Sequence, residues 1–495
     1  MEKKKKGNTM WILLLMILLS VITQVISLVK GATIASKFGA TSEMDAFNFT
    51  QSIANFIFSF VSTGITTVLI PAYIAKTAKK TIDSFITVIY GVGLGLIIII
   101  SLFQKPIVHT FSSGSVVFFE VAISVFLINL LTNFISSLTG VTNAFFQCKE
   151  RFILPKILNI LSIFITVLLI LNINNITIYK YAVILLISTA ISSVIQIFCA
   201  MKDGFRYCPV IGIKDEGLKK LLIVFLPTVF STGLYQISLL TDSLVSSNLG
   251  EGQLSILNYS NNIMSMVSTL IITNLITYIY PRIANDILMD DMAESQKRFF
   301  DYIIIFFVIM CLIVVGFLSV GKEGIMLLYE RGKFTSILTD KVYLCTCIYM
   351  LGMPINVSRD LIYRYFYAHG DTKTTLKNSV IISILNIVIS ILLSKIIGVY
   401  GIILGTVITS FLSLSMIMIR FIKKFGFYAD KNVIVIEIVK TSIICVISIA
   451  VMLQVRRIWN LTNAFVSIVV YGSLSVIVYL LLCILFKSKI LKMRL

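Results

Sequence analysis

Charged residues are scarce in this sequence, and that scarcity excludes an ordinary soluble protein. Asp, Glu, Lys and Arg make up 13% of the 495 residues, whereas hydrophobic residues make up 58% and the mean hydropathy is +0.98. Soluble globular domains carry about 25% charged residues. The composition therefore predicts a polytopic α-helical membrane protein, because a helix satisfies its own backbone hydrogen bonds in lipid.

Residues that build catalytic or metal centres are also few. The two histidines, His109 and His369, lie far apart without Cys or acidic clusters, so a zinc site is not expected. The eight cysteines include no C-x-x-C, and most fall in apolar stretches, where a thiol acts as a small hydrophobe. Gly332-Lys333 lacks the spacing of a phosphate-binding loop, no G-x-S-x-G occurs, and every predicted outer loop is short. These absences favour a transporter without a resident cofactor over an enzyme.

Long uncharged runs dominate what is present. A helix that crosses ~30 Å of hydrocarbon needs about 20 residues. The runs long enough are 10–29, 46–75, 84–104, 121–148, 157–179, 181–201, 221–241, 252–281, 302–321, 342–358, 378–394, 396–419 and 458–486, with a weaker one, 432–455, that contains Glu437 and Lys440. The first run follows four lysines but precedes no small-residue cleavage site, so we interpret it as a retained helix. The prediction is an all-α membrane protein with 14 transmembrane helices.

Lys and Arg are distributed unevenly between the two sets of loops. With the N-terminus placed inside, the inside segments carry 30 of them and the outside segments carry 11. Cytoplasmic loops are enriched in these residues. Both termini are therefore predicted to be cytoplasmic, and the net charge of +19 needs no nucleic-acid partner.

The second and eighth runs are similar to each other. Residues 48–53 (Asn-Phe-Thr-Gln-Ser-Ile) align with 258–263 (Asn-Tyr-Ser-Asn-Asn-Ile), and Pro71 aligns with Pro281. An offset of six spans predicts a parallel repeat about an axis along the membrane normal. We therefore expect a six-helix lobe 1–201, a cytoplasmic linker 202–220, a six-helix lobe 221–425 and two additional helices with a basic tail, 426–495. Two such lobes around a central cleft suit alternating access.

Polar side chains in the first, second and eighth runs are the candidate lining of that cleft. Asn48, Gln51 and Asn55 share one helix face by their spacing, as Asn261 and Asn262 do with their neighbours in the matching run. Gln24, Lys30 and Asp45 fall in the same region, and these eight residues are the predicted substrate-binding set. Hydrogen bonding between packed helices is the alternative interpretation.

Lys30 follows twenty uncharged residues, so it either snorkels at a helix end or meets an anionic head group in the cleft. Asp45 either pairs with Lys30 or simply starts the second span.

A weaker pattern concerns a monovalent cation. Asp242 ends the seventh span, Asn386 and Ser390 are four residues apart on the eleventh, and Thr406 is on the twelfth. Hard cations take oxygen ligands of this kind. The end of the chain, 487–495, carries Lys487, Lys489, Lys492 and Arg494 and is expected to lie near anionic lipid.

Three motifs carry a family resemblance. Lys30-Gly31-Ala32 with Ala35–Ala40 and Asp45-Ala46-Phe47 resembles the opening of the MVF family, the MurJ/MviN-type lipid II flippases of the larger multidrug/oligosaccharidyl-lipid/polysaccharide exporter superfamily. Leu328–Thr335 resembles that family's glycine–Phe–Thr signature, and Tyr365–Thr374 its "FYA-GDTKTP" turn.

The resemblance implies a flippase that moves an undecaprenyl-pyrophosphate-linked saccharide to the outer leaflet of the bacterial cytoplasmic membrane, for peptidoglycan synthesis. It implies a cationic cavity and a lipid-tail groove formed by the last two helices. The family's cavity arginines match Gln24, Asn262 and a position near Ser59, so Lys30 alone keeps a charge. The family's sodium site would use Asp242, Asn386, Ser390, Thr406 and the backbone of Ile402. Ser390 stands where the family can carry a second carboxylate, so ion binding should be weak or lost.

Lipid II is favoured as the substrate over an O-antigen, capsule or exopolysaccharide repeat unit. The other interpretations are a multidrug exporter of the same superfamily, a membrane-embedded polysaccharide polymerase or ligase, and a scaffold subunit of a cell-wall complex. Cell-wall synthesis proteins are candidate partners, and Na⁺, H⁺ or the membrane potential is the candidate source of energy.

Overall fold

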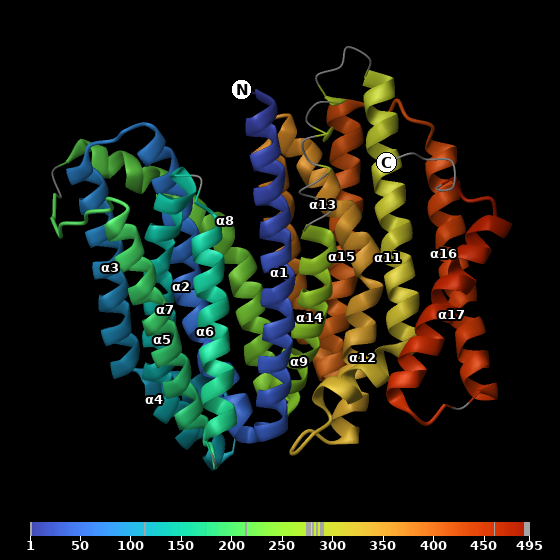
Figure 1. Cartoon of the computed structure of the whole chain (residues 1–495), viewed down its shortest axis with the longest axis horizontal. Coiled ribbons are helices and arrows are strands. Elements are labelled where there is room, and N and C mark those ends of the chain that lie inside the picture. Colours follow the sequence, from blue (N-terminus) through green and yellow to red (C-terminus); the bar gives the residue numbers. More distant parts are fainter. Residues whose placement is uncertain are drawn as a thin grey trace. The chain divides into compact units, whose positions relative to one another are not determined.

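The structure is a computed structural model in which every regular element of the described residues is a helix (Figure 1). It describes residues 2–112, 115–149, 151–173, 175–212, 215–273, 292–459 and 461–489, together with 279, 282, 283, 286 and 287. By its packing the chain divides into two compact units, Met1–Ser255 and Ile256–Leu495.

The first unit is a bundle of long helices. Its elements are α1 (Glu2–Phe38), α2 (Ser42–Ile74), α3 (Lys79–Leu102), the short α4 (Gln104–Phe111), α5 (Val116–Cys148), α6 (Ile153–Asn172), α7 (Ile178–Lys202), α8 (Glu216–Ser247) and the start of α9 (Gln253–Val267). Helix α5 packs along both α2 and α7, α6 packs along α7 and α1, and α8 packs along α2 (Figure 1). Apolar side chains such as Phe38, Phe47 and Tyr181 form its core between α1, α2, α5 and α7.

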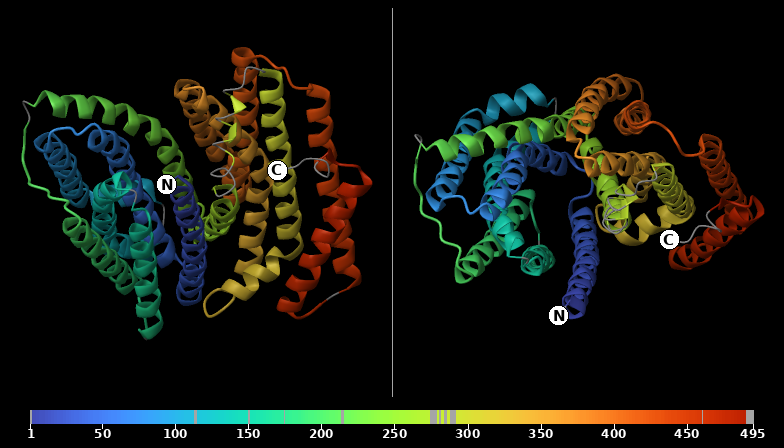
Figure 2. Two further views of the ribbon diagram at one scale, coloured as in Figure 1. Left: turned by 45° about the horizontal axis from the view of Figure 1, so that its top comes forward. Right: turned by 90° about the horizontal axis from the view of Figure 1, so that it is seen from above.

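The second unit contains the remaining helices. They are the rest of α9, the π-helical turn η1 (Ser268–Thr273), α11 (Met292–Tyr329), α12 (Ser336–Leu351), α13 (Met353–Ala368), α14 (Thr372–Ile397), α15 (Val399–Phe425), α16 (Lys431–Ile458) and α17 (Ala464–Leu485). Its core gathers on α11, whose Phe299 and Phe300 meet Tyr365 and Phe421 of α13 and α15. Helices α16 and α17, red in Figure 2, pack against each other and against α11.

Each of the predicted apolar runs overlaps a helix, which confirms the all-α expectation. Ten helices in the described part of the chain are long and apolar enough to cross a membrane. The figure of 14 transmembrane helices stays a prediction. Part of the run 252–281, residues 274–278 and 280–281, lies outside the described residues.

The run 342–358 is interrupted by a helix break. Helix α12 ends at Leu351, Gly352 separates the two helices, and Pro354 stands in the first turn of α13. Proline fits there because the first N–H groups of a helix have no intrahelical acceptor. The single predicted run 342–358 is therefore two helices in the structure.

The two charges that weaken the run 432–455 neutralise each other. Lys440 Nζ lies 2.6 Å from Glu437 Oε1, and the other oxygen of Glu437 accepts hydrogen bonds from Ser488 Oγ and the Lys489 backbone. Lys489 also reaches Asp301 on α11. The start of the predicted basic tail is thus tied to α11 and α16, while Lys492 and Arg494 lie outside the described residues.

The predicted lobe boundaries, 201 and 221, are not tested by the division into units. That division follows packing, and α8 falls in the first unit because it packs along α2. The repeat boundaries stay a prediction.

Candidate functional site

Two of the predicted residues, Gln24 and Lys30, lie on α1 and are half-buried. No ion pair of Lys30 is found in the part of the chain that the structure describes. An ammonium group at this depth is costly unless it meets a polar or anionic partner. The role of Lys30 as a contact for an anion stays a prediction.

Asp45 has a different partner from the one weighed in the sequence. It lies in the first turn of α2, is 2% exposed, and accepts hydrogen bonds from the backbone N–H of Gly252 (2.6 Å) and of Ser255 (2.7 Å). The Ser255 hydroxyl donates a third bond, at 2.6 Å. Asp45 thus caps the first turn of α9, where backbone N–H groups lack intrahelical acceptors and the helix dipole favours an anion. The carboxylate thus bonds to Gly252 and Ser255 and not to Lys30.

The contact joins matching positions of the predicted repeat. With the offset of 210 that aligns residues 48–53 with 258–263, Asp45 corresponds to Ser255 and Ser42 to Gly252. The Gly252 N–H donates to Asp45, and in near-symmetry the Ser42 N–H donates to Glu251 (3.0 Å). Gly252 adopts φ +80°, and a Cβ there would lie 2.7 Å from the Ala40 carbonyl oxygen. We call this contact of Ser42 and Asp45 with residues 251–255 the α2–α9 junction.

The polar face of α2 continues from this junction. Asn48 Nδ2 donates to Ser255 Oγ at 3.3 Å, and the hydroxyl of Ser52, one turn further, donates to Ser243 Oγ of α8 at 3.0 Å. Gln51 is half-buried, and its Oε1 is buried without a donor among the described residues. Asn55 is exposed. The hydrogen bonds of Asn48 and Ser52 fit the alternative interpretation of helix packing, and a role of this face in substrate binding stays a prediction.

In the second unit, Asn261 is half-buried and Asn262 is exposed on α9. Both are polar, as the repeat predicts. Their role in substrate binding stays a prediction.

Four of the five predicted cation ligands come together between α14 and α15. Asn386 Nδ2 donates to Thr406 Oγ1 (3.3 Å), and the hydroxyls of Ser390 and Thr406 both donate to the Ile402 carbonyl, at 3.5 and 3.3 Å. Asp242 is buried on α8, in the first unit. The oxygens of this Asn386 cluster suit a hard cation. Those of Ser390, Thr406 and Ile402 take part in these hydrogen bonds, whereas Asn386 takes part through its amide nitrogen. Among the described residues no group of three or more His, Cys, Asp or Glu is placed to hold a metal ion.

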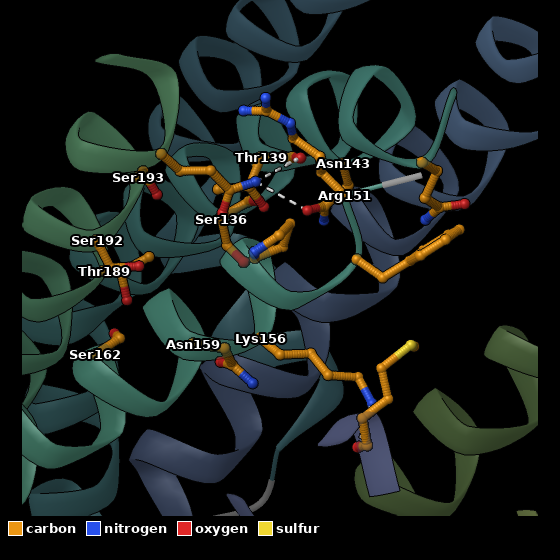
Figure 3. A pocket seen from close by; sticks show the side chains of 15 residues that line it. Ser136, Thr139, Asn143, Arg151, Lys156, Asn159, Ser162, Thr189, Ser192 and Ser193 are labelled. Carbon is orange, nitrogen blue, oxygen red and sulfur yellow. Dashed lines mark hydrogen bonds between the residues drawn. The ribbon is translucent and has the colours of Figure 1, made fainter. Parts of the chain in front are cut away.

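The sequence did not predict a polar cavity inside the first unit. It has a volume of about 420 Å³ and lies between α5, α6, α7 and the Met16 turn of α1 (Figure 3). Its lining is mainly hydroxyl and carboxamide side chains, joined by Arg151 and Lys156. We call it the α5–α7 cavity; none of the predicted substrate-binding residues lines it.

A signal for this cavity was present in the sequence. Thr139, Asn143 and Gln147 recur every fourth residue on α5, Lys156, Asn159 and Ser162 every third residue on α6, and Thr189, Ser192 and Gln196 lie on one face of α7. Each spacing places its residues on one helix face. The same test that singled out Asn48, Gln51 and Asn55 would have found three polar faces on consecutive helices.

Comparison with known proteins decides the family. The model of the family described as "Lipid II flippase MurJ" matches residues 34–472, which is most of the chain. The chain belongs to the lipid II flippase MurJ family. This confirms the resemblance stated from the three motifs, and with it a multi-pass membrane protein of a transporter family.

Relatives and solved structures agree with this membership of the MurJ family. The chain is 28% identical over 413 residues to the "Probable lipid II flippase MurJ" of Rickettsia prowazekii, covering 81% of each chain. It is 23% identical over 424 residues to the protein of the same name from Vibrio cholerae, covering 81% of this chain and 80% of the relative.

Among solved structures, a lipid II flippase MurJ in an inward closed conformation superposes with a TM-score of 0.79, at 21% identity, over 96% of this chain and 100% of that one. An inward-facing multidrug MATE transporter gives a TM-score of 0.65 at 14% identity, over 82% and 94% of the two chains. These likenesses show a shared fold.

Proposed function

We propose that this protein flips lipid II from the inner to the outer leaflet of the bacterial cytoplasmic membrane, with 14 transmembrane helices and both termini in the cytoplasm. Membership of the MurJ family carries the proposal. The excess of Lys and Arg in one set of loops supports the orientation. Short outer loops and the absence of a catalytic motif support a transporter that does no covalent chemistry.

Lys30 is the residue we expect to meet the pyrophosphate. A diphosphate carries at least two negative charges, and a low-dielectric site makes each unmatched charge costly. The family resemblance implies cations at the positions of Gln24 and Asn262, so we expect carboxamide donors to take the place of charges there. Asn48 and Gln51 extend the same chemistry along α2. Lys30 then supplies the charge and the amides supply hydrogen bonds, an arrangement that suits a head group rich in hydroxyl and amide groups.

The α2–α9 junction is the part we expect to open when the head group leaves on the outer side. It joins the first turn of α2 to the first turn of α9, at the end of both helices that the charge count places outside. Its bonds are short and largely buried, but few. Alternating access requires contacts that close one side of the cleft and can be replaced by water when that side opens.

We propose that the membrane potential drives transport without a resident cofactor. An inside-negative potential favours outward movement of an anionic head group by about 2.3 kcal/mol per charge per 100 mV. The Ile402 carbonyl already accepts hydrogen bonds from two hydroxyls, and Ser390 supplies no second carboxylate, so we expect Na⁺ to bind weakly.

Lys30 can be tested directly in proteoliposomes that carry fluorescent lipid II. We expect Lys30→Ala to lower the flipping rate roughly 10-fold or more, since charge-assisted hydrogen bonds contribute about 1.5–3 kcal/mol. Lys30→Arg should keep part of the rate because the charge remains. Lys37→Ala, in the last turn of the same helix, is the matched control and should flip as the unmodified protein does.

Unchanged flipping in Lys30→Ala would remove the anion contact from the account. If the unmodified protein flips a capsule or O-antigen precursor but not lipid II, the substrate assignment is wrong while the transport mechanism stands. Repeating the assay without a potential, with and without Na⁺, separates the two energy sources.

A further inference from the structure

The α5–α7 cavity is not used by the flipping mechanism. It lies wholly within the first unit, and neither Lys30 nor any residue of the α2–α9 junction lines it. Its volume of about 420 Å³ falls in the range of about 300–1,000 Å³ that is typical of small-molecule sites. A cavity of this size lined by polar groups requires a polar occupant, because such groups are costly to leave unsolvated.

The uncharged part of the lining is rich in hydrogen-bonding groups that the protein holds in place. Gln196 is 4% exposed, and its Nε2 donates to Thr142 Oγ1 and Asn143 Oδ1, both at 2.8 Å. Asn143 uses its carbonyl oxygen for this bond, so its own N–H₂ group remains a donor for the cavity. Ser192 and Ser193 are buried hydroxyls on α7, the helix that also carries Gln196. Hydroxyls and carboxamides in this arrangement suit a ligand with hydroxyl groups.

The charged part of the lining is cationic. Lys156 Nζ donates to the Met16 carbonyl at 3.0 Å and to Ser20 Oγ at 2.7 Å, both on α1. An ammonium has three N–H donors, so one remains for a ligand. Arg151 pairs with Asp203, outside the cavity, through one of its five N–H donors. No carboxylate occurs among the described residues that line the cavity. The cavity therefore favours an anion.

We propose that the α5–α7 cavity binds the head group of an anionic, hydroxyl-bearing phosphate ester, supplied by a glycerophospholipid such as phosphatidylglycerol. The segment 149–156, which carries Arg151 and Lys156, is on the side that the charge count assigns to the cytoplasm. Basic pockets between transmembrane helices on that side suit lipid head groups. The phosphate meets Lys156 and Arg151, and the glycerol hydroxyls meet the Asn143 and Ser192 side.

This site has a consequence for α1. Lys156 holds the Met16–Ser20 turn of α1, the helix that carries Gln24 and Lys30. A bound phosphate shares the Lys156 ammonium with that turn. Lipid at this site therefore acts on the position of the helix that we expect to contact the substrate.

Native mass spectrometry of the purified full-length protein tests the proposal. The probes are phosphatidylglycerol, phosphatidylcholine as the zwitterionic comparison, and glycerol 3-phosphate as the soluble source of the same chemistry. Retention of phosphatidylglycerol should fall roughly 10-fold in Lys156→Ala, because a charge-assisted hydrogen bond is lost. Asn143→Leu, which keeps all charges, should weaken it as well. Lys219→Ala, an exposed lysine on α8 on the same predicted side, is the matched control.

Preferential retention of phosphatidylglycerol that is lost in Lys156→Ala and Asn143→Leu but kept in Lys219→Ala supports a lipid site. If glycerol 3-phosphate binds and the lipids do not, and binding is lost in Lys156→Ala and Asn143→Leu, the cavity recognises the proposed phosphate ester. Its ligand is then a soluble molecule and not a lipid. Equal retention of both lipids, or equal retention in all three variants, overturns the proposal. Thermal unfolding of each variant shows that it has folded. The measurement requires no transport, so its failure is distinguishable from failure of the proposed lipid II activity.

Discussion

The fifth and sixth spans of the two predicted repeats are α6 and α7 in the first unit and α14 and α15 in the second. The polar side chains of these two helix pairs are arranged differently. Between α6, α7 and α5 the polar side chains surround a cavity of about 420 Å³. Between α14 and α15 they bond to one another: Asn386 to Thr406 and Thr409, and Asn378 to Ser413. We call this second arrangement the α14–α15 seam.

Glycine and the connecting loop explain the difference. Gly398 alone, with φ +62°, joins α14 to α15, whereas residues 173–177 join α6 to α7. A Cβ at Gly401 would lie 2.3 Å from the Leu393 carbonyl oxygen, and one at Gly405 would lie 3.1 Å from Ser390 Oγ. These glycines let the two backbones approach closely, as small residues do at helix interfaces in membranes. Polar residues in a span therefore line a cavity only where the helices are held apart.

The largest expected effect comes from adding volume to both places. Ser390→Leu in the seam should lower the Tm by about 1–3 °C, since overpacking costs about 1–3 kcal/mol and the serine is fully buried against Gly405. Ser162→Leu on α6 faces the cavity and is the matched substitution. Its Tm should stay close to that of the unmodified protein. Thermal unfolding in detergent measures both, and equal losses would remove the distinction between cavity and seam.

A smaller effect is expected at the start of the seam, where α14 has a side-chain cap and α6 has none. Asp371 accepts hydrogen bonds from the Thr374 backbone and hydroxyl and pairs with Lys424. Burial opposes the charge, but these partners outweigh it and hold the pKa of Asp371 below its usual range. Its stabilising contribution, about 1 kcal/mol for a cap of this kind, is therefore full above pH ~4 and is lost as the pH falls further.

Asp371→Asn should thus have a lower Tm than the unmodified protein at pH 7. The difference between the two Tm values should become smaller as the pH falls towards 3. Asp340→Asn is the control, because its ion pair with Lys322 is exposed. A gap for Asp371→Asn that is independent of pH would show that the carboxylate charge is not what matters.

The smallest effect concerns single hydrogen bonds in the seam. Thr409→Val keeps the shape of the side chain and removes a hydroxyl that accepts from Asn386 at 3.2 Å. Hydrogen bonds between membrane helices contribute about 0.6 kcal/mol on average, so the Tm should fall by about 0.6 °C. Flipping should stay independent of Na⁺. A strong dependence on Na⁺ that disappears in this variant would instead make the seam a working cation site.

The fold was predictable because its signals are local. Long apolar runs mark helices wherever they occur, and the uneven Lys and Arg distribution predicts an orientation without any tertiary information. The break at Gly352 was missed because a glycine followed two residues later by proline lies inside a run that is apolar throughout. Glu437 and Lys440 weakened a correct prediction, since their pairing with each other is visible only once α16 is formed.

The site was predictable only in part, because the sequence alone does not show which distant residues contact each other. The polar face of α2 follows from its spacing. That Asp45 caps α9 depends on a residue 210 positions away, and the sequence does not distinguish this from an ion pair with Lys30. The four predicted cation ligands between α14 and α15 were proposed for their oxygens, and that role stays a prediction. Their mutual hydrogen bonds depend on how closely Gly401 and Gly405 allow the helices to approach.

A reversible lock on the α2–α9 junction tests lipid II flipping by alternating access most directly. Ser42→Cys combined with Glu251→Cys, in a chain whose native cysteines are replaced, joins the two positions when oxidised. In proteoliposomes with labelled lipid II, we predict that the reduced protein flips the lipid, that oxidation stops flipping and that reduction restores it. Lipid II flipping that continues at the same rate in the oxidised protein would contradict this prediction.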